Sequence, residues 1–289
     1  MDGKHFFPSI APALGAVELE LESQTSAIVG AWSGDGAAGG AVERAVGHIF
    51  AKRGKLLRPA LVLLSAGLAE PRPRGIALQG SLVRLATAVE LIHDASLVHD
   101  DIIDNAESRR HQVSLNKRFG NRVAVLAGDI LYTNFFSSIT GLKNLDQGKR
   151  FQLLDIFLDT TKAMCMGEII AQEVAAAGKP LGVAEYVEIA TDKTAVLFAA
   201  CCRTAAVLCD APEPLQRCLG EMGLNFGLAF QMADDLVDKD HGLDESVDLE
   251  RITLSYAQKA RDGLAELPGG AHRDSLRDLV EYVISSAIP

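Results

Sequence analysis

The stretch VRLATAVELIHDASLVHDDIID, residues 83–104, decides the fold class of this chain. Its apolar residues return every three or four positions, which is the spacing of one face of an α-helix. Residues 121–142, NRVAVLAGDILYTNFFSSITGL, show the same period. No segment alternates convincingly between apolar and polar residues, as a half-buried strand would. The sequence therefore predicts an all-α protein.

Glycine and proline predict where the helices end. These residues gather in five segments: 30–40, 69–75, 175–182, 209–214 and 266–272. None of the five is long enough to separate two domains, and the chain contains no repeat of fixed period and no low-complexity tract. We therefore expect residues 1–289 to form a single domain, a bundle of long, mostly antiparallel helices around a central cavity.

The composition excludes several classes of function. The 28 basic residues are outnumbered by 38 acidic ones, which gives a net charge of −10, whereas a general nucleic-acid surface needs an excess of basic charge. The five cysteines are odd in number and form no CxxC pair, so we expect reduced core thiols without disulfides or zinc. We find neither a secretory signal nor an uncharged apolar run of about eighteen residues. We therefore expect a soluble, cytoplasmic protein without a transmembrane segment.

A cluster of acidic residues ends the opening stretch. In a helix, Asp100 and Asp104 lie one turn apart on one face, and Asp101 lies about 100° around the axis from Asp100. Clustered carboxylates without a thiolate favour Mg²⁺, which takes one or two carboxylates and fills its other positions with water and substrate phosphate. The guanidinium groups of Arg109 and Arg110, which follow closely, suit phosphate oxygens. The alternative interpretation is a solvated helix end with local ion pairs.

A second acidic cluster lies in FQMADDLVD, residues 230–238, again within an apolar helical stretch. Antiparallel helices of a bundle could bring both clusters to one cavity mouth, where they would face each other across Mg²⁺ ions and a diphosphate. The predicted metal ligands are Asp100, Asp101, Asp104, Asp234, Asp235 and Asp238.

Four motifs together resemble the trans-polyprenyl diphosphate synthases. The motifs are GKLLRP (54–59), HDDIID with the following arginine pair, DKTA (192–195) and FQMADDLVD, and their order and spacing are similar to the family's from about residue 45 onward. The resemblance implies the all-helical isoprenoid synthase fold and a homodimer. It also implies a prenyltransferase that joins an allylic prenyl diphosphate head to tail to isopentenyl diphosphate, with Mg²⁺ held by both aspartate motifs.

The resemblance assigns roles to individual side chains. Eight match family positions that contact a diphosphate or lie near the leaving group: Lys55, Arg58, His93, Arg109, Arg110, Lys193, Thr194 and Gln231. Lys55, Arg58 and Arg110 match the contacts to isopentenyl diphosphate, and Arg109 matches a contact to the allylic diphosphate. The implied catalytic residues are Asp100, Asp104, Asp234 and Lys193. Without the resemblance, basic side chains usually lie on a solvated surface, and a lone histidine usually packs in a core.

Product length is a further expectation. In the family, the product grows into a tunnel below the first aspartate motif, and the positions five and four residues before Asp100 are here the small Ala95 and Ser96. We therefore expect a product longer than fifteen or twenty carbons, with Tyr132, Phe135 or Phe136 as candidate floor residues. The alternative is that these aromatic side chains only fill the core.

The sequence departs from the family pattern at two places. His111 replaces the usual glycine after the arginine pair. A lysine-containing segment that the family usually has after the second motif is missing, because no lysine occurs between Lys239 and Lys259. Lys239 is one candidate substitute. These departures bear on turnover more than on fold.

Three other functions fit parts of the sequence. A class I terpene cyclase also ionises allylic diphosphates, but its second motif usually differs from DDLVD. A metal-dependent phosphohydrolase could use the His–Asp pairs at 93–94 and 99–100, although their six-residue spacing places them on different helix faces. A catalytically impaired partner subunit of a heteromeric synthase would explain the missing lysines, but such a subunit has no need for two costly carboxylate clusters.

Overall fold

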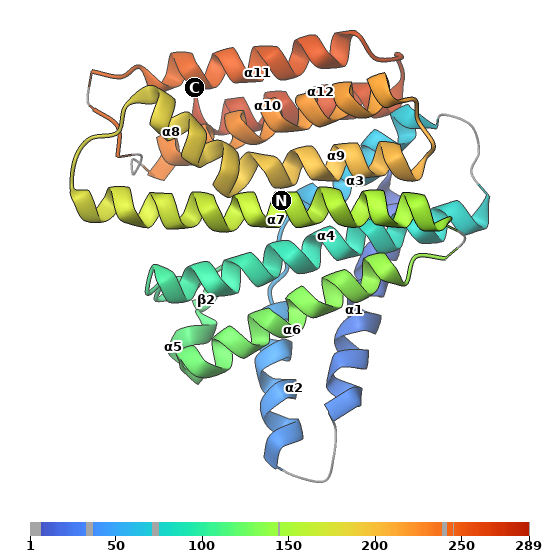
Figure 1. Ribbon diagram of the computed structural model, residues 1–289, viewed down its shortest axis with the longest axis vertical. Coiled ribbons are helices and arrows are strands. Elements are labelled where there is room, and N and C mark those ends of the chain that lie inside the picture. Colours follow the sequence, from blue (N-terminus) through green and yellow to red (C-terminus); the bar gives the residue numbers. More distant parts are fainter. Residues whose placement is uncertain are drawn as a thin grey trace. The chain divides into compact units, whose positions relative to one another are not determined.

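The computed structural model describes residues 7–32, 37–70, 75–143, 145–238, 242–244 and 246–288. The described chain is all-α, as the sequence predicts, apart from one small hairpin (Figure 1). The helices are α1 (Ala11–Trp32), α2 (Ala37–Phe50), α3 (Leu57–Ala69), α4 (Ile76–Ile103), α5 (Leu115–Phe119), α6 (Asn121–Thr140), α7 (Gln147–Ala177), α8 (Val183–Ala190), the π-helix η2 (Thr191–Ala195), α9 (Val196–Leu208), α10 (Glu213–Asp238), α11 (Leu249–Ala265) and α12 (Ala271–Ala287).

All five predicted breaks coincide with helix ends. Within the glycine-rich segment 30–40, α1 ends at Trp32 and α2 begins at Ala37, so that some of its glycines lie inside helices. A glycine inside a helix costs only about 1 kcal/mol, which tertiary packing can offset. The all-α prediction did not include the antiparallel hairpin of β1 (Ser108–Arg109) and β2 (Gln112–Val113).

Contacts group the described residues into two units. The first contains those within Met1–Ala60 and Gly75–Leu145, and the second those within Leu61–Arg74 and Asp146–Pro289, so that the boundary falls inside α3. The expectation that residues 1–289 form a single domain stays a prediction. Each unit is described here by itself.

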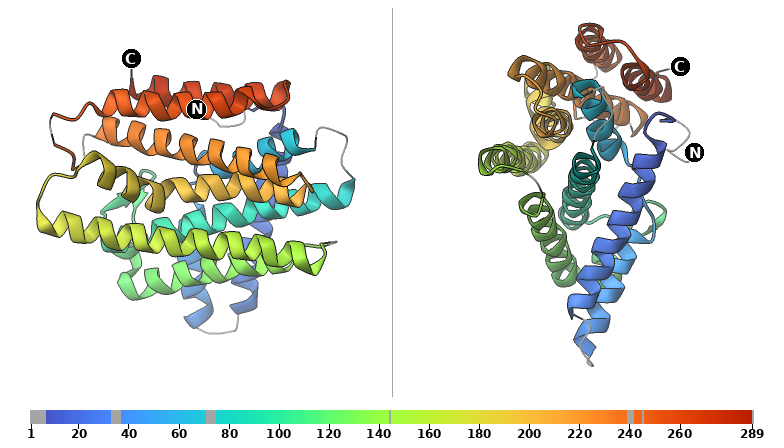
Figure 2. Two further views of the ribbon diagram at one scale, coloured as in Figure 1. Left: turned by 45° about the horizontal axis from the view of Figure 1, so that its top comes forward. Right: turned by 90° about the vertical axis from the view of Figure 1, so that its right-hand side faces the viewer.

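In the first unit, α4 and α6 pack side by side in antiparallel directions (Figures 1 and 2). Near the end of α4, His99 lies against Gly128, where an added Cβ would come within 2.3 Å of the ring. At the other end, Arg84 Nη1 donates to the Gly141 carbonyl at 3.1 Å. These contacts fix the register of the two helices and therefore the position of the first aspartate motif.

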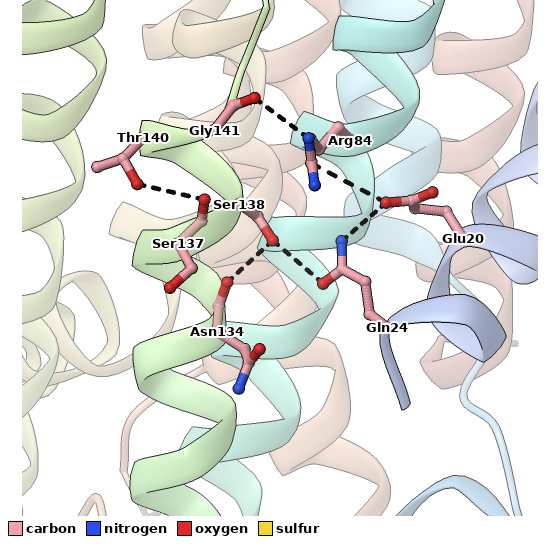
Figure 3. Close-up of polar contacts among 8 residues, drawn as sticks. All are labelled: Glu20, Gln24, Arg84, Asn134, Ser137, Ser138, Thr140 and Gly141. Atoms are coloured by element: carbon pink, nitrogen blue, oxygen red, sulfur yellow. Dashed lines mark hydrogen bonds and ion pairs between the residues drawn. The ribbon is translucent and has the colours of Figure 1, made fainter. Parts of the chain in front are cut away.

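A polar cluster joins α1 to the ends of α4 and α6 that lie away from this motif (Figure 3). Gln24 Nε2 donates to Glu20 at 3.0 Å, and the buried Ser138 hydroxyl donates to Gln24 Oε1 at 3.1 Å. Arg84 Nε lies 4.0 Å from the Glu20 carboxylate. The cluster satisfies the buried Ser138 hydroxyl and holds α1 against the helix pair.

In the second unit, α10 packs against both α9 and α11. Two glycines let α10 approach its neighbour closely. A Cβ at Gly227 would lie 2.7 Å from the Ala195 Cα, and one at Gly223 would lie 2.7 Å from the Phe198 carbonyl oxygen. This close packing presses the π-helix η2 against the second aspartate helix.

One described helix, α6, is long and apolar enough to cross a membrane by length and composition. A core helix has the same composition, and α6 packs along α4. The prediction that the cysteines are core residues holds for Cys201, Cys202 and Cys209, which are buried. It was wrong for Cys165, which lies on an exposed face of α7.

Candidate active site

The first aspartate motif forms the last turn of α4. The Asp104 amide closes this turn by donating to the Asp100 carbonyl at 2.8 Å, and Asn105 then leaves the helix with a φ of 50°. Asp100 is half-buried and Asp104 is exposed, and their side chains share one helix face. Asp101 is buried, and its carboxylate accepts from Arg109 Nε at 2.9 Å and Nη2 at 2.6 Å.

The hairpin after α4 carries the two arginines on a strained turn. Arg109 pairs with Gln112, which leaves Arg110 and His111 as the two turn residues, with φ values of 51° and 61°. A two-residue turn with both φ values positive normally contains Asn–Gly. The left-handed conformation costs a residue with a side chain about 1–2 kcal/mol. This explains why glycine suits position 111 in the family and what its replacement by His111 costs.

Arg110 reaches back to the middle of α4. Its Nη2 donates to Asp94 at 3.0 Å, and its Nη1 donates to the Lys52 carbonyl at 3.3 Å. The guanidinium passes Gly54, where an added Cβ would lie 2.9 Å from Nη2. Glycine at the start of GKLLRP therefore makes room for this arginine.

Buried ionisable groups lie beneath the arginines. Burial, and then the charge of Asp94, raises the pKa of the Glu90 carboxyl to about 7. Burial also raises the pKa of Asp94, while Arg110 opposes that rise. Burial lowers the pKa of His93 well below its usual value, and the charges of Arg58 and Arg110 lower it further. The charge of Arg58 lowers the pKa of Glu90 and that of His93.

The basic residues predicted from the sequence for the first unit therefore largely come together. The charges of Arg58, Arg109 and Arg110 all lower the pKa of His93, and Lys55 is exposed on the segment that precedes Arg58. Guanidinium groups near a neutral imidazole favour an anion with several oxygens. A cation would be repelled there, which argues against a phosphohydrolase metal held by His93. The other His–Asp pair, at 99–100, does not favour a metal either. His99 Nε2 lies 3.2 Å from the Val125 carbonyl, so this nitrogen already has a protein partner.

The second aspartate motif forms the last turns of α10 in the other unit. Asp234 and Asp238 are exposed one turn apart. Asp235 accepts from the Tyr186 hydroxyl and from Gln231 Nε2, the latter at 2.8 Å. Burial, and then the Asp235 charge, raises the Tyr186 pKa.

The DKTA segment is continuous with this network. The Thr194 hydroxyl donates to Gln231 Oε1 at 2.8 Å, so that a chain of hydrogen bonds runs from DKTA to the second motif. Lys193 forms an ion pair with Glu168 at 2.6 Å. The segment is a π-helix, a distortion that occurs frequently at functional sites. Gly167 permits its approach to α7, because a Cβ there would lie 2.6 Å from the Lys193 amide nitrogen.

The donor chemistry of the two motifs fits Mg²⁺. Among the described residues, no three acidic, histidine or cysteine side chains could hold a metal by themselves. Mg²⁺ does not need three, because it binds through one or two carboxylates and substrate phosphates. Each motif presents such a pair one turn apart. Asp101 and Asp235 bind protein side chains in the structure, and their role as metal ligands stays a prediction.

The predicted chain-length residues all lie on the packed α4 and α6 pair. Ala95 is buried, and Ser96 donates to the His93 carbonyl at 2.9 Å. The rings of Tyr132, Phe135 and Phe136 form one cluster, with centroids 4.8–6.5 Å apart. In the register of the two helices, this cluster lies roughly 9–15 Å from Asp100 along α4.

Residues 40–244 match the sequence profile described as polyprenyl synthetase. The chain belongs to the polyprenyl synthetase family. Among its relatives, a Synechocystis prenyl transferase is 37% identical over 195 residues, which cover 66% of this chain and 56% of the relative. An octaprenyl diphosphate synthase from Haemophilus influenzae is 34% identical over 193 residues, with 66% and 54% covered. The chain thus spans about half the length of the curated relatives it matches.

Solved structures of polyprenyl synthases share the fold. A decaprenyl diphosphate synthase from Rhodobacter capsulatus has a TM-score of 0.81 at 23% identity, with 99% of this chain and 100% of that chain covered. A Caulobacter crescentus polyprenyl synthase, solved with calcium and isoprenyl diphosphate, has a TM-score of 0.80 at 24% identity, with 98% of each chain covered. The isoprenoid synthase fold predicted from the motifs is therefore confirmed.

In this member of the polyprenyl synthetase family, several residues beside the predicted site were not predicted as part of it from the sequence. They are His48, Glu90, Asp94, Glu168 and Tyr186. The sequence could have indicated Glu90 and Asp94. Two acidic residues one turn apart in an otherwise apolar helix need a buried partner, which points to a basic group nearby. No local pattern indicates the others, because their partners lie 25–70 positions away.

Proposed function

We propose that this chain is a magnesium-dependent prenyltransferase that condenses an allylic prenyl diphosphate head to tail with isopentenyl diphosphate, giving a longer polyprenyl diphosphate. The observation that carries the proposal is the pair of Arg109 and Arg110, which Asp101 and Asp94 hold against the helix that carries the first aspartate motif. Family membership and the names of the relatives support it.

Isopentenyl diphosphate binds to the basic group of the first unit. Lys55, Arg58 and Arg110 neutralise its diphosphate, and His93 donates a further hydrogen bond as a neutral imidazole. Arg109 faces the allylic diphosphate. The carboxylates of Asp94 and Asp101 orient Arg110 and Arg109, and these ion pairs limit the freedom that each arginine loses on binding.

Mg²⁺ would be held by Asp100 and Asp104 in one motif and by Asp234 and Asp238 in the other. When bound, the metal stabilises the negative charge that develops on the departing diphosphate. Calcium in the related Caulobacter crescentus structure supports a divalent-cation site in this fold.

The protein side chains guide the remaining chemistry. The allylic carbon–oxygen bond breaks with its electron pair on the diphosphate, and the isopentenyl alkene supplies the pair for the new carbon–carbon bond. A proton then leaves the condensed cation for the released diphosphate. Lys193 and Thr194 lie beside the leaving group, and Gln231 fixes the Thr194 hydroxyl. The apolar faces of the surrounding helices exclude water that would capture the cation.

The product grows along the face of α4 below Asp100. Ala95 and Ser96 leave space there, and Tyr132, Phe135 and Phe136 form the floor roughly 9–15 Å further on. The proposed product is longer than fifteen or twenty carbons.

The proposed enzyme is a cytoplasmic homodimer. Val125 and Leu126 of α6 are 42% and 62% exposed, and they present an apolar surface that a second copy would cover.

One observation favours a second function, that of an impaired partner subunit. After α10, the chain returns quickly to the α7–α8 connection, where the Leu181 amide donates to the Gly242 carbonyl at 2.8 Å. The short connection is where the family's lysine-containing segment is missing, and Lys239 lies outside the described residues.

A condensation assay distinguishes the two functions. Purified protein is incubated with Mg²⁺, radiolabelled isopentenyl diphosphate and farnesyl diphosphate, and the dephosphorylated products are separated by chain length. We expect a metal-dependent series of longer prenols that Asp100→Ala abolishes. If no condensation occurs with farnesyl, geranylgeranyl or shorter primers, the synthase proposal is wrong and the partner-subunit function replaces it.

A further inference from the structure

His48 of α2 is a buried histidine that holds two parts of the segment after the arginine pair. It is 8% exposed. Its Nε2 lies 2.7 Å from the Val113 carbonyl of β2, and its Nδ1 lies 3.1 Å from Arg118 Nη1 of α5. A carbonyl can only accept a hydrogen bond and a guanidinium can only donate one. The ring therefore carries its hydrogen on Nε2 and accepts on Nδ1.

The rest of His48 binds the same segment. Its backbone carbonyl accepts from Gln112 Nε2 at 3.0 Å. Its ring packs edge-on against Phe119, with centroids 5.7 Å apart, and Arg118 lies over that aromatic ring. A single residue thus fixes β2 and α5 to α2.

The hairpin needs such an anchor because its turn is strained. Arg110 and His111 both have positive φ values, and neither is the residue that this turn prefers. Strained backbone persists only where surrounding contacts determine it. In the hairpin, Gln112 pairs with Arg109 and Val113 pairs with Ser108. His48 binds Gln112 and Val113, so it holds the strand that lies opposite Arg109.

We propose that His48 is a positioning residue that, as the Nε2–H tautomer, holds the strained hairpin so that Arg109 and Arg110 present their guanidinium groups to a diphosphate. The inference rests on the diphosphate site of the proposed function. It does not depend on turnover, because it concerns binding to the arginines alone.

Calorimetric titration with inorganic pyrophosphate tests the proposal without requiring catalysis. His48→Leu removes both ring hydrogen bonds and is expected to weaken binding about tenfold, the effect of losing one net hydrogen bond. His48→Gln keeps an amide donor near the position of Nε2 and is expected to bind within about twofold of the unaltered protein. Thermal unfolding is followed for each variant. This distinguishes a variant that no longer folds from one that folds but no longer positions Arg109 and Arg110.

His111→Gly provides the matched test of strain. Glycine adopts the positive φ without cost, so the hairpin no longer needs its anchor. We expect this change to leave pyrophosphate binding intact and to restore most of the binding that His48→Leu loses. If His48→Leu does not fold alone, the double variant and His48→Gln decide the question.

The proposal is overturned if folded His48→Leu binds pyrophosphate as the unaltered protein does. It is also overturned if His48→Gln weakens binding as much as His48→Leu, or if His111→Gly restores nothing. Failure of condensation together with the expected binding pattern would overturn the proposed function and leave the role of His48 supported.

Discussion

Replacing Glu90 with glutamine should change how the stability of the fold depends on pH. Glu90 is 4% exposed and lies one turn before the buried Asp94, so burial and the neighbouring carboxylate favour its protonated form. Glutamine has nearly the same shape but carries no charge. The variant therefore removes the ionisation and leaves the packing of α4 almost unchanged.

The magnitude follows from the shift in pKa. The pKa of Glu90 rises from 4.5 to about 7 on folding, so between these values the folded state holds a proton that the unfolded chain has released. Stability therefore falls as the pH rises through this window, and the shift corresponds to a total of about 3 kcal/mol. The contribution is fully present below pH 4.5 and lost above about pH 7. Asp94→Asn should act in the same direction, because the pKa of Asp94 is also raised by burial.

Urea unfolding of both proteins from pH 5 to pH 8, followed by circular dichroism, measures this effect. The lowered pKa of His93 has the opposite effect, because it makes the fold lose stability as the pH falls. His93 is present in both proteins, so its contribution cancels when their stabilities are compared. The stability of Glu90→Gln relative to the unaltered protein should rise by about 2 to 3 kcal/mol from pH 5 to pH 8, because part of the total change occurs below pH 5. A difference that does not change with pH would refute the reasoning.

Three further substitutions have defined outcomes. Tyr186→Phe removes the hydrogen bond to Asp235 and should lower the unfolding free energy by about 1.5–3 kcal/mol in urea titrations; no change would mean that this bond is not formed. Gly227→Ala forces a methyl group against Ala195 and should cost about 1–3 kcal/mol in the same assay, whereas an unchanged midpoint would contradict the close packing. Ala95→Phe should shorten the prenol products, and an unchanged product distribution would show that the product does not pass this residue.

The helical architecture could be predicted from the sequence because its signals are local. Apolar periodicity gave α4 and α6, and glycine or proline marked the ends of α3, α7, α9 and α11. The hairpin after α4 was not predicted, since its strands have two residues each and its turn contains Arg110 and His111 instead of glycine. The strand that follows this turn contacts His48 on α2, which is far away in the sequence.

The site could be predicted only as a set of charged residues. Two aspartates of each motif are aligned by helical spacing alone, whereas the partners of Asp101 and Asp235 depend on tertiary packing. The π-helix at residues 191–195 lies in close contact with Gly167 and Gly227, which no local pattern indicates. Spacing therefore predicts the ligands, and packing decides which side chains orient them.

The central claim is that both aspartate motifs serve one metal-assisted reaction, and a double-mutant cycle tests it most directly. The condensation rate at saturating Mg²⁺ is measured for Asp100→Asn, Asp234→Asn and the double variant. If both motifs act on one departing diphosphate, the double variant should lose little more activity than the more damaged single variant. Losses that multiply, or a single variant that retains full activity, would contradict the account.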